Sequence, residues 1–162
     1  MKRISWDDLF MAMVYLMSMK SKDTKTHVGA VIVGPLNEVR SVGFNGIPIG
    51  VNDNITKRHK RPEKYYWMEH AERNAILLSP YNVRGCKMYT NGIPCMNCAR
   101  SIVQAGISEV IVDKVWDDNN YNQWIEEAER TKTMFEESGV KLRFWDGQLV
   151  SEIYRFRNGE KL

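Results

Sequence analysis

Residues 86–114, CKMYTNGIPCMNCARSIVQAGISEVIVDK, hold the pattern that decides the fold. Residues 86–90 read as a strand, a turn reaches Pro94, and residues 95–105 read as a helix. Gly106 follows that helix as the residue type favoured just beyond a helix C-terminus, and 108–114 reads as a second apolar strand. Two neighbouring strands joined through a helix run parallel, because the crossover returns the chain to the same end of the sheet.

The same alternation continues on both sides of this stretch. Towards the N-terminus we expect a helix over 6–19, a hairpin of strands 26–34 and 38–44, and a helix over 69–78. Towards the C-terminus we expect a helix over 122–138, a strand over 140–145 and a short helix near 148–157. Strands separated by helices predict an α/β sandwich whose later strands are parallel.

Length and composition restrict the class of protein. The 162 residues predict a single domain, 1–162, and 43% hydrophobic with 27% charged residues is typical of a globular chain. The net charge of +3 gives no support for a nucleic-acid partner. Three cysteines are an odd number, which favours a reducing compartment over a disulfide framework. The apolar run 9–17 is far shorter than the ~20 residues that span a bilayer, so we expect a cytoplasmic protein without membrane contact.

Metal-ligating residue types stand at the start of two predicted helices. His70 opens one helix, and Cys95 and Cys98 open the other. Taken alone, a Cys-x-x-Cys pair is compatible with a redox pair, half of a structural zinc site, or chance. Three protein ligands with one open position is instead the pattern of catalytic zinc.

A closed structural zinc site would need a fourth protein ligand. Cys86 is the candidate, although at the start of a strand it reads more naturally as a small buried hydrophobic residue. His27 at a strand entrance and His59 in a basic loop read as structural or solvated.

Two glutamates flank His70. Glu72 is placed to approach the open metal position from the side, where a carboxylate performs general acid–base chemistry. Glu69 is the competing carboxylate, and its position favours a role at the helix N-terminus, where negative charge is stabilising.

The HAE of 70–72 and the PCMNC of 94–98 together form the His-x-Glu and Pro-Cys-x-x-Cys signature of zinc nucleobase deaminases. Further stretches are similar to deoxycytidylate (dCMP) deaminases: SKDTKTHVGAVIVG (21–34), GFNGIPIG (43–50), RPEKYYWMEHAERNAI (61–76) and PCMNCARSIVQAGI (94–107). GFNG and RPEKYYWMEHAE are the discriminating ones, because HAE and PCxxC alone fit cytidine or transfer-RNA adenosine deaminases equally well.

The resemblance implies a three-layer α/β/α cytidine-deaminase-like sandwich with a mixed five-stranded sheet. It implies zinc-dependent hydrolysis of dCMP to dUMP and ammonia, which supplies dUMP for thymidylate synthesis. Carried over residue by residue, it makes His70, Cys95 and Cys98 zinc ligands and Glu72 the proton shuttle.

For substrate binding, the resemblance points to Asn45 as a contact to the sugar and to Ala71. The alternative for Asn45 is a turn residue before Gly46 that uses the tolerance of asparagine for left-handed geometry. Trp116 and Tyr121, in a segment where no match to the family is evident, would either stack on the base or fill surface packing.

The family is also associated with dCTP as activator, dTTP as inhibitor, Mg²⁺ with a bound dCTP, and a homo-oligomer, often a hexamer. Gly46, Arg61 and Lys64 are the candidate nucleotide or phosphate contacts, although a basic run such as 57–64 also reads as a solvated loop. Ile49 departs from the polar or basic residue expected in the regulatory loop. Two other functions remain open: a deaminase of a free nucleoside or an RNA base, and a non-catalytic zinc-stabilised interaction module.

Overall fold

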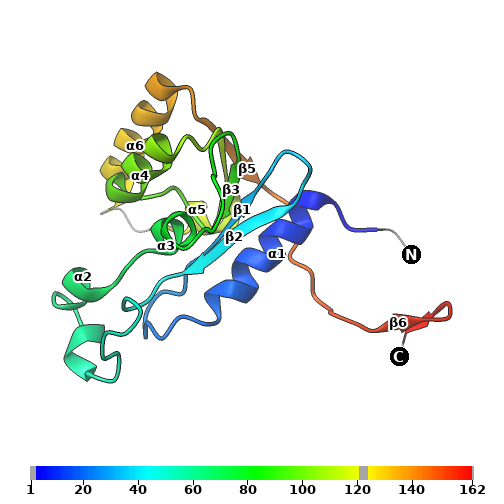
Figure 1. The fold of residues 1–162 in the computed structure, drawn as a ribbon, viewed down its shortest axis with the longest axis horizontal. Coiled ribbons are helices and arrows are strands. Elements are labelled where there is room, and N and C mark those ends of the chain that lie inside the picture. Colours follow the sequence, from blue (N-terminus) through cyan, green and yellow to red (C-terminus); the bar gives the residue numbers. More distant parts are fainter. Residues whose placement is uncertain (1–2, 121–123, 162) are drawn as a thin grey trace.

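The computed structural model describes residues 3–120 and 124–161. Its centre is a mixed sheet in the order β2-β1-β3-β4-β5 (Figure 1). The strands are β1 (Gly29–Val33), β2 (Val39–Phe44), β3 (Lys87–Thr90), β4 (Glu109–Asp113) and β5 (Lys141–Trp145). β1 runs antiparallel to β2 and β3, whereas β3, β4 and β5 are mutually parallel. The predicted mixed five-stranded sheet and the parallel pair within 86–114 are both confirmed.

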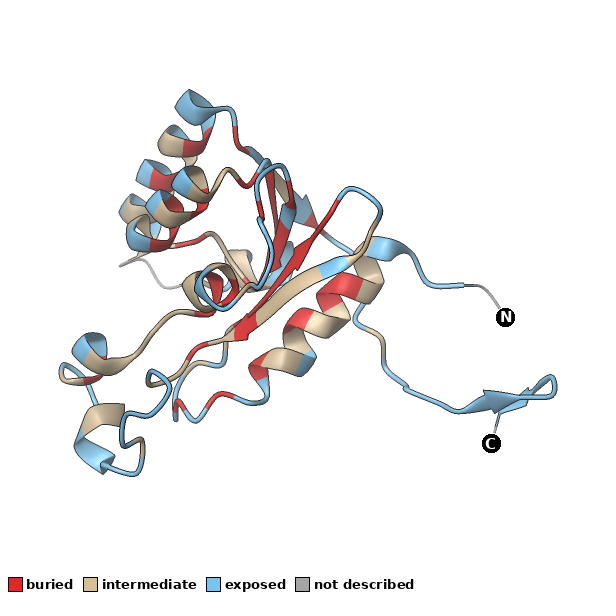
Figure 2. Cartoon of the chain, viewed as in Figure 1, coloured by how far each residue is buried: buried red, intermediate tan, exposed pale blue. Residues whose placement is uncertain are grey.

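Helices cover both faces of the sheet (Figures 1 and 2). The alternating side chains of the strands build two separate cores, because successive residues of a strand point to opposite faces. Ile32 and Val112 pack with α3 (Ala71–Leu77), α4 (Met96–Ala105) and α6 (Ile125–Ser138), whereas Val31 and Ile111 pack with α1 (Trp6–Ser18). The predicted three-layer α/β/α sandwich is therefore confirmed. In the two described ranges, no helix has the length and apolar character needed to cross a membrane.

Gly43 of β2 sets how closely α3 approaches the sheet. A Cβ at this position would lie 2.3 Å from the Ala71 carbonyl oxygen and 2.6 Å from the Ala75 nitrogen, both backbone atoms that could not yield easily. The absence of a side chain at Gly43 therefore lets the start of α3, which follows His70, lie directly on β2. This contact fixes one half of the candidate site.

Three short helices were not predicted: η1 (Thr56–His59), α2 (Lys64–Trp67) and α5 (Lys114–Asp118). Each has only four or five residues, so none carries a helical period long enough to recognise in a sequence. The predicted helices over 69–78 and 95–105 start one or two residues later than expected. His70 and Cys95 are their extended N-cap residues.

The short helix expected near 148–157 is wrong. Residues 146–155 have no regular structure, and β6 (Phe156–Arg157) pairs with β7 (Glu160–Lys161) in a hairpin. Asn158 and Gly159 form its turn with φ of 54° and 84°, and Asn-Gly is the strongest short hairpin signal because both positions require positive φ. This exposed segment extends away from the sandwich (Figures 1 and 2).

Candidate active site

His70, Cys95 and Cys98 come together at the starts of α3 and α4. Both Sγ atoms lie 3.4 Å from His70 Nδ1, and the three donor atoms lie within 4.8 Å of one another. In a tetrahedral zinc site with Zn–S of about 2.3 Å and Zn–N of about 2.0–2.1 Å, sulfur and nitrogen are separated by about 3.6 Å. The three donors therefore already have the spacing and the soft-ligand chemistry that zinc requires.

The two thiols share one negative charge. A hydrogen bond from Cys98, followed by one with His70, lowers the pKa of Cys95 to about 4. The pKa of Cys98 is raised because its proton is held against Cys95 and the thiol is buried near Glu72. The pKa of His70 is raised chiefly by its hydrogen bond with Cys95. A divalent cation displaces such shared protons, because thiolate and neutral imidazole are the forms that bind metal.

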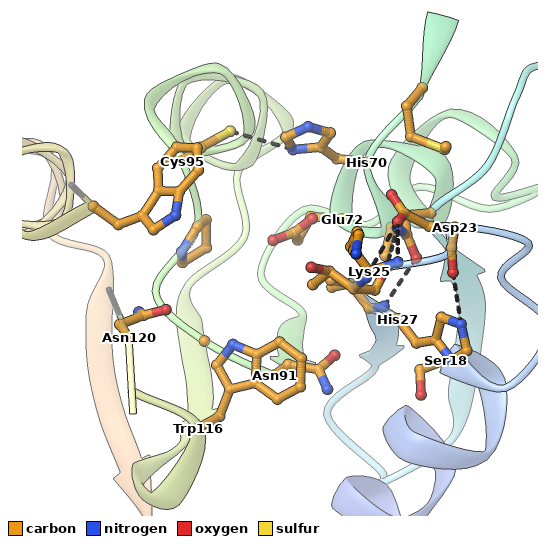
Figure 3. Close-up of a pocket in the computed structure, with 18 of the residues that line it drawn as sticks. Ser18, Asp23, Lys25, His27, His70, Glu72, Asn91, Cys95, Trp116 and Asn120 are labelled. Carbon is orange, nitrogen blue, oxygen red and sulfur yellow. Dashed lines mark hydrogen bonds between the residues drawn. The ribbon is translucent and has the colours of Figure 1, made fainter. Parts of the chain in front are cut away.

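Glu72 brings a buried carboxyl to the same place. Its residue is only 6% exposed, and its Oε2 lies 3.6 Å from Cys98 Sγ. Burial is the main cause that raises the pKa of Glu72, partly offset by the charge of His70. A raised pKa makes a carboxyl a better proton acceptor than an ordinary glutamate, which suits general acid–base chemistry. In Figure 3 the Glu72 carboxyl faces the cleft in the space between His70 and Trp116.

His70, Glu72 and Cys95 line a cleft of about 760 Å³, and Cys98 is buried behind its wall. The cleft lies at the end of the sheet where β1 begins and where β2, β3 and β4 finish. β1 begins there because it is antiparallel to its neighbours β2 and β3. Its volume is in the ~300–1,000 Å³ range of small-molecule sites. Ala71, whose backbone begins α3, lines the cleft beside His70, as do Asn45, Arg61 and Lys64.

Asn45 uses its buried amide to hold the chain that enters β1. Its Oδ1 accepts from the Val28 N–H at 2.9 Å, and its Nδ2 donates to the Thr26 carbonyl at 2.9 Å. The non-glycine residues with positive φ in the described chain are Asn37 and Asn158, so the left-handed turn considered for Asn45 is wrong. A contact from Asn45 to a substrate sugar stays a prediction.

Lys64 is engaged in a buried ion pair. Its Nζ lies 2.8 Å from Asp23 Oδ2, with side-chain exposures of 8% and 3%. Asp23 Oδ1 also accepts from the backbone N–H groups of Lys25 and Thr26 at 2.8 and 3.2 Å. Lys64 therefore fixes the loop after α1, and its charge is already balanced by Asp23.

Arg61 and Gly46 differ from Lys64 in their surroundings. Arg61 is exposed at the cleft, its guanidinium 5.8 Å from the Tyr65 ring, and forms no ion pair within the described ranges. Gly46 exchanges backbone hydrogen bonds of 3.0 and 2.8 Å with Glu69 and is not part of the cleft wall. Glu69 also accepts from the His70 N–H and pairs with Arg73, as expected for a carboxylate at this helix start.

The candidate fourth ligands lie elsewhere. Cys86 is buried in the apolar core with Met88 and Val110, outside the donor group. His27 and His59 each bond a backbone carbonyl through Nε2, at 2.8 Å to Asp23 and 2.6 Å to Asp53. Within the described chain, the metal-ligand cluster therefore has three protein donors.

Trp116 lines the cleft, packed so tightly over Gly92 that a Cβ there would lie 2.6 Å from the indole Cδ1. Tyr121, the other aromatic candidate, lies outside the described residues. Sequence reasoning missed Asn91 and Asp23, which are buried in the cleft wall. For Asn91 a signal was available, since polar residues directly after the strands of an α/β sheet commonly face a ligand.

Known proteins are similar to this chain in sequence and in fold. Residues 4–114 match the family described as the cytidine and deoxycytidylate deaminase zinc-binding region. Deoxycytidylate deaminases of Homo sapiens and Mus musculus are each 38% identical over 148 residues, covering 86% of this chain and 79% of theirs. The crystal structure of dCMP deaminase from the cyanophage S-TIM5 in complex with dCMP and dUMP has the same fold. It superimposes with a TM-score of 0.69 at 22% identity, over 90% of this chain and 100% of that one. The chain belongs to the cytidine and deoxycytidylate deaminase family.

Proposed function

We propose that this protein catalyses the hydrolytic deamination of dCMP to dUMP, with release of ammonia. One observation carries the proposal: three zinc-type donors stand beside the buried carboxyl of Glu72 in a nucleotide-sized cleft. The family supports the reaction class. The human and mouse relatives, named deoxycytidylate deaminases, support dCMP as the substrate.

His70, Cys95 and Cys98 would hold the zinc ion. When bound, zinc supplies Lewis acidity that brings the pKa of a water from about 15.7 to about 7. Glu72 accepts a proton from the attacking water and delivers it to N3 of the pyrimidine, which makes C4 more electrophilic. The oxygen of the water becomes O4 of the product. Glu72 then takes the second proton from that oxygen and passes it to the amino group, so the C4–N4 bond breaks, ammonia leaves and the C4 carbonyl of dUMP forms.

The remaining cleft residues would orient the nucleotide. Ala71 is the first residue of α3 and lies between His70 and Glu72 in the chain. Its backbone N–H is available to the base, because the first N–H groups of a helix have no intrahelical acceptor. Asn45 is proposed to contact the sugar, and Arg61 the phosphate because it is an exposed cation at the cleft. Lys64 acts on the same region indirectly, since its ion pair holds the loop that contains Asp23.

The test is turnover of purified, zinc-loaded protein, followed by the ultraviolet change on conversion of cytosine to uracil. dCMP is compared with cytidine, dCTP and a short RNA, with Glu72→Gln as the control for contaminating deaminase. Turnover of dCMP that disappears in Glu72→Gln supports the proposal. Turnover of cytidine or RNA but not dCMP would replace the substrate, and one zinc per chain without turnover of any of these would favour a binding module.

Finer properties of the proposal have two sources. A single catalytic domain over 1–162 and a cytoplasmic location rest on the length and composition of the sequence. Activation by dCTP with Mg²⁺, inhibition by dTTP and a homo-hexamer rest on the resemblance alone. The dCMP assay with each triphosphate, with and without Mg²⁺, tests regulation. Light scattering of the same samples measures the number of chains per particle, and a monomer that ignores both triphosphates would refute the regulatory part.

A further inference from the structure

Asn91, the residue after β3, has a buried amide with one unused end. Its Oδ1 accepts from the Gly29 N–H at 2.7 Å, and the residue is 0% exposed. A backbone N–H can only donate, so this bond fixes which end of the amide is oxygen. Nδ2 must then point the other way, and it has no hydrogen-bond partner within the described residues. A buried donor left in this state is unfavourable and calls for a ligand.

The place of Asn91 mirrors that of Asn45. Asn45 follows β2 and holds the Val28 N–H, whereas Asn91 follows β3 and holds the N–H of the next residue, Gly29. The two asparagines thus stand on either side of β1, about 10 Å apart at two strand spacings. Asn91 lies on the side that continues into Pro94 and Cys95, at the reacting end of the cleft.

Two aromatic rings lie beside this amide. Trp116 packs over Gly92, and its ring centroid is 6.3 Å from that of Tyr15. Burial and Asp113 raise the pKa of Tyr15, and the nearby Asn91 amide acts in the opposite direction, although Nδ2 does not reach hydrogen-bond geometry with the hydroxyl. The Tyr15 hydroxyl donates to Asp113, so it is held in place. Trp116 is half-buried on the five-residue α5, and its indole N–H has no hydrogen bond among the described residues. Figure 3 shows Trp116 and Asn91 on the same side of the cleft.

We propose that Asn91 is a substrate-binding residue, whose Nδ2 donates a hydrogen bond to the O2 carbonyl of the pyrimidine when the Trp116 ring shifts to admit the base. This inference rests on the proposed deamination of dCMP. O2 is the acceptor that remains on the base edge, because N3 receives the proton from Glu72 and the C4 amino group is a donor. The same oxygen is present in dUMP, so product and substrate use the contact alike.

Asn91→Asp isolates the donor from the structural role of the residue. The carboxylate keeps an oxygen for the Gly29 N–H but replaces Nδ2 with a second acceptor. Asn37→Asp, in the β1–β2 turn at the other end of the strands, makes the same chemical change and serves as the matched control. Zinc content and melting temperature are measured for both variants, so a folding or metal defect is recognised directly.

For Asn91→Asp we expect kcat/KM for dCMP to fall roughly 10- to 100-fold, and the inhibition constant of dUMP to rise by a similar factor. Asn37→Asp should match the wild type in both. Unchanged kcat/KM and dUMP inhibition in a folded, zinc-loaded Asn91→Asp would overturn the proposal. If the wild type itself does not deaminate dCMP, the failure lies in the proposed function.

The atom contacted is tested with the 2-thio analogue of dCMP, because sulfur accepts hydrogen bonds more weakly than oxygen. The wild type should turn over the analogue roughly 10-fold less efficiently, whereas Asn91→Asp should discriminate little between the two substrates. If the two losses multiply independently, Nδ2 does not bind O2 and the assignment is wrong. The wild-type comparison shows whether O2 accepts a hydrogen bond, and the comparison with Asn91→Asp assigns that bond to Nδ2 rather than to another donor such as the Ala71 N–H.

Discussion

Replacement of Lys64 by methionine should destabilise the whole protein, because it leaves Asp23 as a buried charge without a partner. The side chains are 8% and 3% exposed and 2.8 Å apart. Removing one member of such a pair costs about 3–5 kcal/mol of unfolding free energy. Asp23 keeps its two backbone N–H donors, so the loss should lie near the lower end, about 3 kcal/mol.

A double variant separates the effect of an unpaired buried charge from a simple loss of packing. Asp23→Asn with Lys64→Met leaves a neutral amide beside an apolar side chain, so much of the lost stability should return. Urea unfolding of the wild type, both single variants and the double variant at pH 7 measures the coupling. Additive losses, or a loss below about 1 kcal/mol in Lys64→Met, would refute the reasoning.

The same variants have a predicted pH dependence. Burial acts to raise the pKa of Asp23, but the hydrogen bond with Lys64 and those from Lys25 and Thr26 lower it below its ordinary 3.8. An acid with a depressed folded-state pKa contributes stability above its unfolded pKa and loses it as the pH falls through the folded pKa. In Lys64→Met the main lowering cause is gone and burial acts to raise the pKa of Asp23, so the gap between wild type and variant should narrow as the pH falls through that higher pKa and should close as wild-type Asp23 protonates below 3.8. A gap that is constant over this range would exclude the carboxylate as its cause.

Three further predictions concern the active site and its surroundings. Glu72→Ala should keep fold and zinc but lower kcat by about 10²–10⁴, the size of general acid–base contributions; normal turnover would remove Glu72 from the mechanism. Cys86→Ser should keep one zinc per chain by metal analysis, whereas Cys98→Ser should lose it, and zinc loss from Cys86→Ser would instead indicate a four-ligand structural site. Trp116→Ala should raise KM for dCMP roughly 10-fold if the indole stacks on the base, with kcat changed less; an unchanged KM would assign the ring to packing alone.

The sequence predicted those parts of the site that depend on local signals. His70, Cys95 and Cys98 stand at helix starts within short, recognisable patterns, and the structure brings their donor atoms together. Asp23 could not be found in this way, because its partner Lys64 is 41 residues away and their pairing depends on the folded chain. Asn91 is an intermediate case: its position directly after a strand was a usable signal, but its contact with Gly29 across 62 residues of sequence was not.

The errors also have physical causes. The helix expected near 148–157 is wrong, and Asn158 and Gly159 just beyond it carry the hairpin-turn signal that the expectation overlooked. The phosphate contact expected for Lys64 stays a prediction, but its ion pair with the buried Asp23 was not foreseen, because a linear sequence does not reveal which cation of a basic run is already neutralised. The basic run therefore indicated a region near the site, but it did not show what each of its residues does.

α6 lies outside the family-matched residues 4–114, yet its side chains bind the backbone on both sides of Cys95. Glu127 Oε1 accepts from the Met96 N–H at 2.9 Å, at the first turn of the helix that carries both cysteines. Thr131 Oγ1 donates to the Pro94 carbonyl at 2.8 Å, directly before Cys95. Substitutions in α6 can therefore affect the active site. Exchanging this helix between relatives would change the electrostatic setting of the thiolates without touching a single ligand, so zinc affinity can evolve through a segment remote from the signature.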